Sequence, residues 1–278
     1  MSAAASAYEP TPPRMQRAQG ELRIAWRNRD GTTALADLRQ QGCLKARFPR
    51  PVDWAEAVLL NSSGGIAGGD QLAIDLEMGQ GARATFSAQA AERFYRALPT
   101  DAPARVATTL TLAPGAAAEW LPQESILFDA AALHRTLDIH MAADAHLLAV
   151  ETLVFGRALM GETVHTLRLS DTIRLTRAGR LELHDATRLH GDIQPILARR
   201  ASAAGARAMA TILLAAPHAA AYLQPLRDTL SADAAASTWN NLLVARVLAP
   251  TAAALRTTLV AALHVLRDGR ALPRVWSC

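Results

Sequence analysis

Apolar and polar side chains alternate along most of the chain. In ELRIAWRN, residues 21–28, Leu22, Ile24 and Trp26 fall on one side, and polar or small residues fall on the other. A period of two predicts a half-buried β-strand. The same alternation, with turn residues between the segments, recurs in AVLL (57–60), QLAIDLEM (71–78), ARATFSAQ, RVATTLTL, HRTLDIHM, HLLAVETLVFG, HTLRLSDTIRL and GRLELHDATRL.

The number and spacing of these segments predict a mainly β architecture. About ten strands follow one another with only short turns between them, whereas a βαβ protein would need a helix between successive strands. The chain shows no strict sequence repeat, so periodicity alone does not identify a solenoid. The alternation fits a two-layer sandwich and an irregular β-helix equally well.

The C-terminal third has a different pattern. Apolar residues spaced by three or four predict a helix over residues 218–230 and a second over residues 250–267, which ends at Gly269. The preceding segment ARAMATILLAA contains enough alanine for a helix, but its Thr, Ile and Leu ahead of Pro217 favour a buried strand. The closing segment ALPRVWSC is expected to pack its tryptophan against the body.

The two ends of the chain and its cysteines suggest where the protein is found. Residues 1–20 are rich in Ala, Ser and Pro and are predicted to be a disordered tail, followed by a single domain over residues 21–278. The N-terminus lacks a secretory pattern, and no stretch is apolar enough for a membrane helix. Cys43 and Cys278 cannot form a disulfide framework. We expect a soluble, cytoplasmic protein with two unpaired thiols and no membrane partner.

The basic charge is carried almost entirely by arginine. Lys45 is the single lysine against 28 arginines, and the formal net charge is +4. Arginine favours fixed, bidentate contacts with carboxylates. The charges are interspersed, without a run of like sign, so no nucleic-acid partner is expected and an acidic protein partner fits better.

A glycine-rich stretch, NSSGGIAGGDQLAIDLEM, raises the question of a phosphate loop. It contains the four glycines Gly64, Gly65, Gly68 and Gly69 and is followed by Asp70. A phosphate loop needs Gly-Lys before Ser or Thr, and a dinucleotide fold needs a helix after the glycines. Here an alternating strand follows. The stretch is therefore predicted to be a tight turn that uses positive φ.

Candidate catalytic groups are few. No strand-turn-helix elbow of the type G-x-S-x-G is present. Two carboxylates could still converge in space as hydrolytic pairs do, and the candidates are Glu124, Glu151 and Glu162. For each of them, the alternative is a carboxylate paired with one of the many arginines.

Candidate metal ligands are sparse and scattered. His134 and His140 share a strand face, but a rise of about 3.3 Å per residue separates them too far for one ion. Asp138 with His140 makes a short pair, as do two more His and Asp neighbours, His184 with Asp185 and His190 with Asp192. Such open, mixed sites suit a protein that passes a borderline ion such as nickel on.

Four ordered blocks resemble the urease accessory protein UreD (UreH) family. They are VLLNSSGGIAGGDQLAIDLEMGQGARATFSAQAAERFYR, EWLPQESILFD, ETLVFGRALMGE and the closing LPRVWSC, and the resemblance as a whole extends over roughly residues 21–278. Many relatives have tandem prolines where this chain has Ser62 and Ser63. The resemblance implies an irregular β-helix-like body of many short strands with about two helices in the C-terminal third.

The resemblance also implies a function without catalysis. Proteins of this family bridge apo-urease subunits to UreF and, through UreF, to the GTPase UreG, and nickel is thought to pass through their interior. No cofactor is expected to bind tightly, and Ni²⁺ is expected only transiently. We predict transient nickel contacts at Asp70, Glu124, His140, Glu151 and Glu162.

A second set of residues is predicted to shape the turn motif and a partner surface, namely Gly64, Gly65, Gly68, Gly69, Asp70, Gln123 and Arg157. Two other functions remain as alternatives. A β-helical hydrolase acting on a polysaccharide would need an aromatic-lined groove, which an aromatic content of 5% disfavours. A nickel-storage protein would need dense His or Cys tracts.

Overall fold

A computed structural model describes residues 16–277 of the chain. Residues 1–15 of the predicted N-terminal tail (1–20) lie outside the described residues. Gln19 and Gly20, which we placed at the end of that tail, are the first residues of β1, where Gln19 pairs with Gln71.

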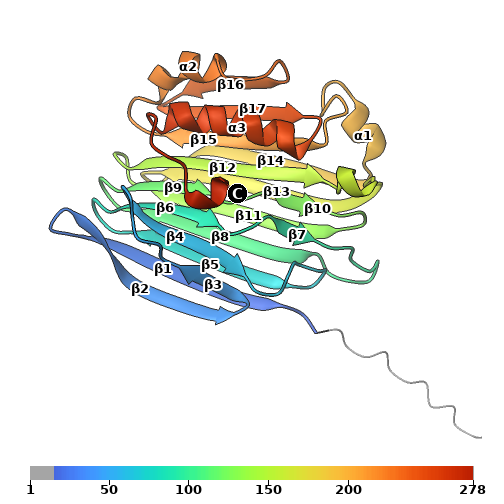
Figure 1. Cartoon of the computed structure of the whole chain (residues 1–278), viewed down its shortest axis with the longest axis horizontal. Helices are drawn as coiled ribbons and strands as arrows, with labels where there is room; N and C mark the ends of the chain where they lie inside the picture. Colours follow the sequence, from blue (N-terminus) through green and yellow to red (C-terminus); the bar gives the residue numbers. More distant parts are fainter. Residues whose placement is uncertain (1–15, 278) are drawn as a thin grey trace, which may run out of the picture.

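Two mixed sheets form the body of the protein (Figure 1). Sheet A has seven strands in the order β14-β13-β11-β8-β5-β1-β2. Its strands are β1 (Gln19–Arg29), β2 (Thr32–Gly42), β5 (Gln71–Met78), β8 (Ala104–Leu112), β11 (Ala132–Met141), β13 (Thr166–Arg177) and β14 (Arg180–Asp192).

Sheet B has ten strands, eight of them in the order β16-β17-β15-β12-β9-β6-β4-β3, with β10 and β7 attached beside β12. Its strands are β3 (Leu44–Arg47), β4 (Ala55–Asn61), β6 (Arg83–Ala88), β7 (Glu92–Phe94), β9 (Ala117–Leu121), β10 (Ser125–Leu127), β12 (His146–Phe155), β15 (Ala208–Ala215), β16 (Ala234–Trp239) and β17 (Leu242–Ala249).

The chain winds between the two sheets as in a β-helix. From β4 to β13 the longer strands alternate between sheet B and sheet A, and those from successive turns of the winding pair in parallel within each sheet. Hairpins at each end, β1–β2 and β13–β14, add antiparallel strands. The predicted mainly β, irregular β-helix-like body is therefore confirmed.

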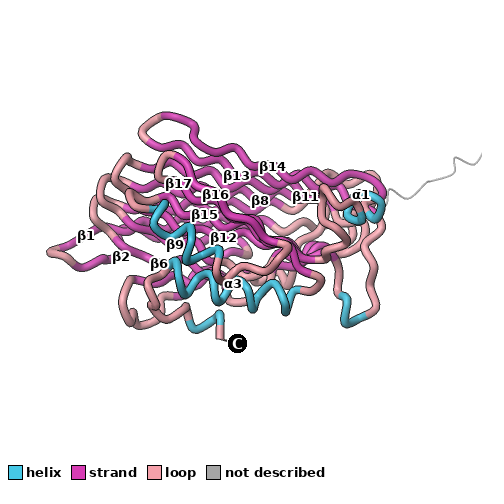
Figure 2. The backbone as a smooth tube through the Cα atoms, turned by 90° about the horizontal axis from the view of Figure 1, so that it is seen from above, coloured by secondary structure: helices cyan, strands magenta, loops and turns pink. Residues whose placement is uncertain are grey.

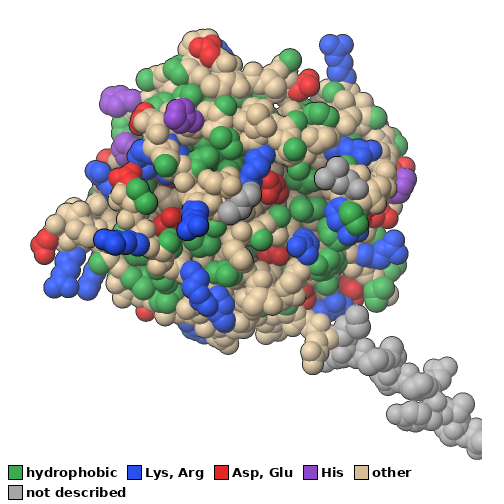
Figure 3. Space-filling view, in the orientation of Figure 1, with side chains coloured by type: hydrophobic (Ala, Val, Ile, Leu, Met, Phe, Trp, Pro, Cys, Tyr) green, Lys and Arg blue, Asp and Glu red, His purple; other side chains and the backbone are tan. Residues whose placement is uncertain are grey.

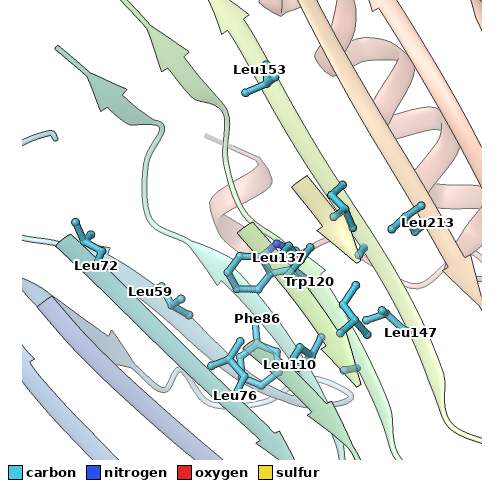
Figure 4. Packing of buried hydrophobic residues seen from close by; sticks show 14 of the residues in the cluster. Leu59, Leu72, Leu76, Phe86, Leu110, Trp120, Leu137, Leu147, Leu153 and Leu213 are labelled. Carbon is cyan, nitrogen blue, oxygen red and sulfur yellow. The ribbon is translucent and has the colours of Figure 1, made fainter. Parts of the chain in front are cut away.

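The space between the sheets is filled by the inward side chains of the alternating strands. Leu76, Phe86 and Leu110 lie close together in this core, with Trp120 and Leu137 nearby (Figure 4). The inner face of sheet A thus follows directly from the period-two pattern of its sequence.

Sheet B is covered on its other face as well. Helix α3 (Ala252–Leu266) packs on β15 and β17 and forms a second apolar cluster with them. Figure 2 shows the helices along the outside of the strand layers. Burial on both faces explains why β12 and β15 read as nearly continuous apolar runs rather than alternating ones. The strand favoured for ARAMATILLAA is confirmed.

The remaining helices are short. They are η1 (Ala158–Met160), α1 (Gln194–Ala198), η2 (Ala219–Tyr222), α2 (Leu223–Arg227) and η3 (Arg274–Trp276). The helix predicted over residues 218–230 corresponds to η2 and α2, and the one predicted over 250–267 is α3. Trp276 is buried, as predicted. Among the described residues, no helix is both long and apolar enough to cross a bilayer.

We did not predict the hairpin β16–β17, which lies between α2 and α3. Its turn is Asn240-Asn241, and both residues have positive φ, 46° and 57°. Two left-handed residues make the turn type that matches the twist of a hairpin, and asparagine tolerates this conformation. The signal was in the sequence, but small alanine-rich strands beside it obscured the alternation.

Candidate functional site

A buried ion cluster lies between the two sheets. Arg135 and Asp171 are neighbours in register on β11 and β13, at inward positions that leucine and isoleucine occupy elsewhere on these strands. The Arg135 guanidinium bonds both Asp171 oxygens, with Nε–Oδ1 at 2.8 Å and Nη2–Oδ2 at 2.7 Å. Its Nη1 also donates to Ser125 Oγ at 2.8 Å. Sheet A therefore presents a fixed charge pair to the interior.

Glu151 meets this pair from sheet B. Its Oε2 lies 2.7 Å from Arg135 Nη1, and its Oε1 accepts a hydrogen bond of 2.7 Å from Trp120 Nε1. Burial raises the pKa of Glu151, and Asp171 adds to this, although Arg135 and the Trp120 bond act in the opposite direction. Glu151 thus joins the two sheets through Arg135.

A second ion pair, between Arg246 and Asp185, extends this cluster into an interior row of charged side chains. On sheet B, Glu151 is paired with Thr211, and Thr211 with Arg246. Arg246 Nη2 lies 2.6 Å from an oxygen of Asp185 on β14 of sheet A. Charged side chains of both sheets therefore face one another along a row that crosses β12, β15 and β17.

Two cavities adjoin this row. The larger, of about 230 Å³, has many apolar side chains in its wall together with Glu92, Gln123, Ser125, Arg135 and Glu151. The smaller, of about 10 Å³, is lined by polar side chains that include Glu151, Asp171, Asp185, Thr211 and Arg246. Of the described residues, Glu151 is the one that lines both cavities.

The larger cavity reaches the surface beside the glycine turn. Exposed Gly64 and Arg93 belong to its wall, as does Glu92, whose Oε2 accepts a hydrogen bond of 3.1 Å from Asn61 Nδ2. Burial raises the pKa of Glu92. A carboxylate therefore stands near the mouth of the cavity, and Glu151 stands at its inner end.

The glycine turn carries the chain from β4 in sheet B to β5 in sheet A. No helix follows it, so the prediction of a tight turn is confirmed. Gly64, Gly65 and Gly69 have positive φ. At Gly65 a Cβ would lie 2.3 Å from Tyr95 Cε2, and at Gly68 it would lie 2.7 Å from Ala97 Cβ. Glycine is needed for conformation and for close approach.

Asp70 closes the glycine turn. Its side chain is buried, Oδ1 accepts from the N–H of Ala18 at 2.8 Å, and Oδ2 accepts from the N–H of Ala67 at 2.7 Å. Both oxygens are thus bonded to the backbone. The structure places Asp70 in a structural role in the turn, and its predicted contact with nickel stays a prediction.

Gln123 and Glu124 hold the C-terminal segment. Arg256 on α3 donates to Gln123 Oε1 at 2.9 Å and to Glu124 Oε1 at 3.2 Å, and it also bonds the Trp276 carbonyl at 2.7 Å. Gln123 Nε2 in turn donates to the Val275 carbonyl at 2.9 Å. Of these two residues, only Gln123 lines the larger cavity.

Arg157 and Glu162 form a loop contact away from the ion cluster. Arg157 Nε donates to Glu162 Oε2 at 2.8 Å, and the guanidinium stacks on the Phe128 ring at 4.1 Å. Burial alone would raise the pKa of Glu162, but the bonds from Arg157 and from the Asp129 N–H outweigh it and lower the pKa. Glu162 also lines a third cavity of about 140 Å³.

His140 lies on the outer face of sheet A. Its side chain is exposed, like that of His134 on the same strand. Asp138, between them, is bonded by Arg174 Nη2 at 2.7 Å, and this bond lowers the pKa of Asp138. The structure thus separates the five predicted nickel contacts, and Glu151 alone among them lines the two cavities of the interior row.

Within the described residues, no three His, Cys, Asp or Glu side chains converge on one metal position. The sequence reasoning missed Trp120 and Arg135, which bond Glu151, and also Asp171 and Arg246 of the same row. A signal for two of them existed, because Arg135 and Asp171 interrupt the inward leucine and isoleucine positions of alternating strands. A charged residue in phase with the core indicates a buried pair.

Comparison with known proteins decides the family. The sequence profile described as UreD urease accessory protein matches residues 18–277. The chain belongs to the UreD family. Urease accessory proteins UreD of Dinoroseobacter shibae and Methylobacterium sp. are 47% and 46% identical to it, over 95% and 96% of this chain and 94% and 98% of theirs. A UreD of Bradyrhizobium sp. is 43% identical over 99% of this chain and 97% of its own length.

Membership of the UreD family confirms the resemblance drawn from the four sequence blocks. It supports a role as a urease accessory protein, and the coverage shows that the relatives correspond to the whole domain rather than to one part of it. The buried cluster of Glu151, Arg135 and Asp171 is therefore part of a UreD fold.

Proposed function

We propose that this chain is a scaffold for urease maturation that binds apo-urease and UreF, reaches the GTPase UreG through UreF, and offers nickel a passage through its interior. Membership of the UreD family supports the accessory role. The observation that carries the passage is the interior row in which Glu151 lines two adjoining cavities between the sheets.

The charge of this row suits a divalent cation. Its buried and half-buried groups include four carboxylates, those of Glu92, Glu151, Asp171 and Asp185, against the guanidinium groups of Arg135 and Arg246. Carboxylate oxygens prefer hard cations and imidazole suits nickel better, so these carboxylates would hold nickel only weakly. An ion entering beside Glu92 would find the next carboxylate at Glu151.

A purely non-catalytic role agrees with the glycine turn. A phosphate loop needs a lysine and a helix after its glycines, whereas this turn has no lysine and leads into strand β5. In this proposal, GTP is therefore bound and hydrolysed by UreG. On the face shown in Figure 3, basic and acidic side chains are interspersed rather than gathered in one patch. This mixed surface suits contacts with other proteins better than with nucleic acid.

The passage is tested by removing the interior charges while keeping side-chain size. In the triple variant Arg135→Met, Glu151→Gln, Asp171→Asn, a buried ion cluster becomes neutral, a change that proteins often tolerate. The matched control is Arg39→Met with Glu21→Gln, an exposed pair that joins β1 and β2 of sheet A and lies away from the predicted nickel contacts.

We expect both variants to co-purify with urease subunits and UreF from cells co-expressing the urease operon. In nickel-limited cells, urease activation should fall in the triple variant and remain normal in the control. Full activation by the triple variant, with its complex intact, would reject the passage. A polysaccharide hydrolase would not capture urease subunits at all, and a nickel-storage protein would bind nickel tightly by itself.

The glycine turn tests the scaffold role separately. Replacing Gly68 and Gly69 by valine puts side chains against Ala97 and Arg17 and strains Gly69, whose φ is +87°. If the turn shapes a partner surface, the variant should lose urease subunits in a pulldown while keeping its strand content by circular dichroism. Unchanged capture would contradict this part of the proposal.

A further inference from the structure

The cluster of Arg135, Glu151 and Asp171 lies between the two interior cavities. Arg135 lines the larger one, Asp171 lines the smaller one, and Glu151 lines both. The guanidinium lies 2.7 Å from Glu151 Oε2 and 2.7 Å from Asp171 Oδ2. An ion that moved from one cavity to the other past Glu151 would therefore meet this guanidinium.

The position between Glu151 and Asp171 requires a cation. All three side chains of the cluster are at most 10% exposed. With Arg135 in place, one positive charge faces two negative ones. Without it, two carboxylates would be buried side by side, and such a pair must take up a proton or bind a cation. Arg135 thus supplies the positive charge that a proton or a metal cation would otherwise have to supply.

The guanidinium has room to withdraw. The larger cavity lies on the side of Arg135 and contains a second carboxylate, that of Glu92, together with the Ser125 hydroxyl that already accepts from Arg135. Arginine is a long side chain with several rotatable bonds. Its charged group can therefore move toward other polar partners without leaving the protein interior.

We propose that Arg135 is a gate for divalent cations: it keeps the Glu151–Asp171 position closed and withdraws into the larger cavity when a divalent cation takes its place. This gate rests on the proposed passage of nickel. A divalent ion carries one more positive charge than the guanidinium and neutralises both carboxylates, whereas a monovalent ion only equals the guanidinium. Competition with Arg135 keeps each stay short, so the ion is passed on.

The variant Arg135→Met tests the gate. It keeps side-chain volume and leaves the two carboxylates without their cation. Isothermal titration of the untagged full-length chain with NiCl₂ should show binding at least about tenfold tighter than in the wild type, since a buried charge pair left unpaired is strongly unfavourable. Activation of urease in nickel-limited cells should fall, because the ion is retained.

Two controls show whether the gain belongs to this position. Arg39→Met removes an arginine from an exposed Arg–Glu pair of sheet A, away from the predicted nickel contacts, and should leave nickel affinity unchanged. The neutral triple variant, which also replaces Glu151 and Asp171, should lose the gain. A folded Arg135→Met chain that binds NiCl₂ no tighter than Arg39→Met would overturn the gate.

If Arg135→Met does not fold, Arg135→Lys provides the test. It keeps the charge, but an ammonium group lacks the planar fork that bonds Asp171 twice, so nickel should displace it more easily. Affinity equal to the wild type would overturn the gate. The passage fails separately, when the neutral triple variant activates urease fully. The gate alone is overturned by a combination of two results: the triple variant loses urease activation, and Arg135→Met and Arg135→Lys bind nickel with wild-type affinity.

Discussion

Glu119 on β9 receives two hydrogen bonds from Arg267, the residue that ends α3, with Nε–Oε1 at 2.9 Å and Nη2–Oε2 at 3.0 Å. Both side chains are almost fully buried. Thr85 and Arg270 donate to the same carboxylate at 2.6 Å each. This cluster fastens the C-terminal end of α3 to sheet B.

Replacing Glu119 by alanine should therefore destabilise the protein strongly. The substitution leaves the Arg267 guanidinium buried without its carboxylate, which costs about 3–5 kcal/mol. Urea unfolding measures the change in the free energy of unfolding. The control is Glu21→Ala, whose partner Arg39 is exposed, and it should cost less than about 1 kcal/mol. Equal effects of the two variants would refute a structural role for Glu119.

Two neighbouring glycines should respond differently to alanine. Gly64→Ala meets no atom within 4 Å and has only the strain of positive φ, about 1–2 kcal/mol. Gly65→Ala adds a Cβ 2.3 Å from the Tyr95 ring, at a φ of +142°. We expect Gly65→Ala to lower the melting temperature clearly more than Gly64→Ala. The same loss in both would show that the Tyr95 ring moves aside.

Asp70→Ala should destabilise the glycine turn. It leaves the N–H groups of Ala18 and Ala67 without an acceptor, and each lost bond costs about 1–3 kcal/mol when the group stays buried. Urea unfolding should show the loss. If Asp70 also contacts nickel as predicted, a folded Asp70→Ala chain should bind NiCl₂ more weakly in isothermal titration, and wild-type affinity would contradict that contact.

Glu92 should make stability depend on pH. Burial raises its pKa in the folded protein, so the unfolded chain releases the proton at lower pH than the folded chain does. Below the unfolded pKa this group has no effect. As pH rises from the unfolded to the folded pKa, the folded state loses stability, and the penalty is complete above the folded pKa.

Glu92→Gln removes this penalty while keeping the bond to Asn61 possible. Its melting temperature should exceed that of the wild type at pH 7 to 8, with the difference vanishing near pH 4, below the usual carboxyl pKa of about 4.3. Thermal unfolding over this pH range measures it. A constant difference across the range would mean that the titration of Glu92 is not its cause.

The interior row was only partly predictable. Glu151 was identified through the block that it shares with UreD proteins, but nothing near it in sequence indicates Arg135 or Asp171. The Arg135 and Asp171 side chains come from strands 36 positions apart, and they meet because β11 and β13 pair in register. Gln123 and Glu124 were likewise identified without their partner Arg256, which lies on α3.

Local patterns in the sequence specify the strands with one buried face, the left-handed turn at the glycines and α3, and its ordered blocks specify membership of the UreD family. Two strands without alternation stayed hidden: β9 is buried throughout, and β2 is an exposed edge. The pairing of charged side chains across the sheets is visible only in the folded protein. This pairing depends on the order and register of the strands. Both are set by the winding of the chain, which brings together segments that are far apart in the sequence.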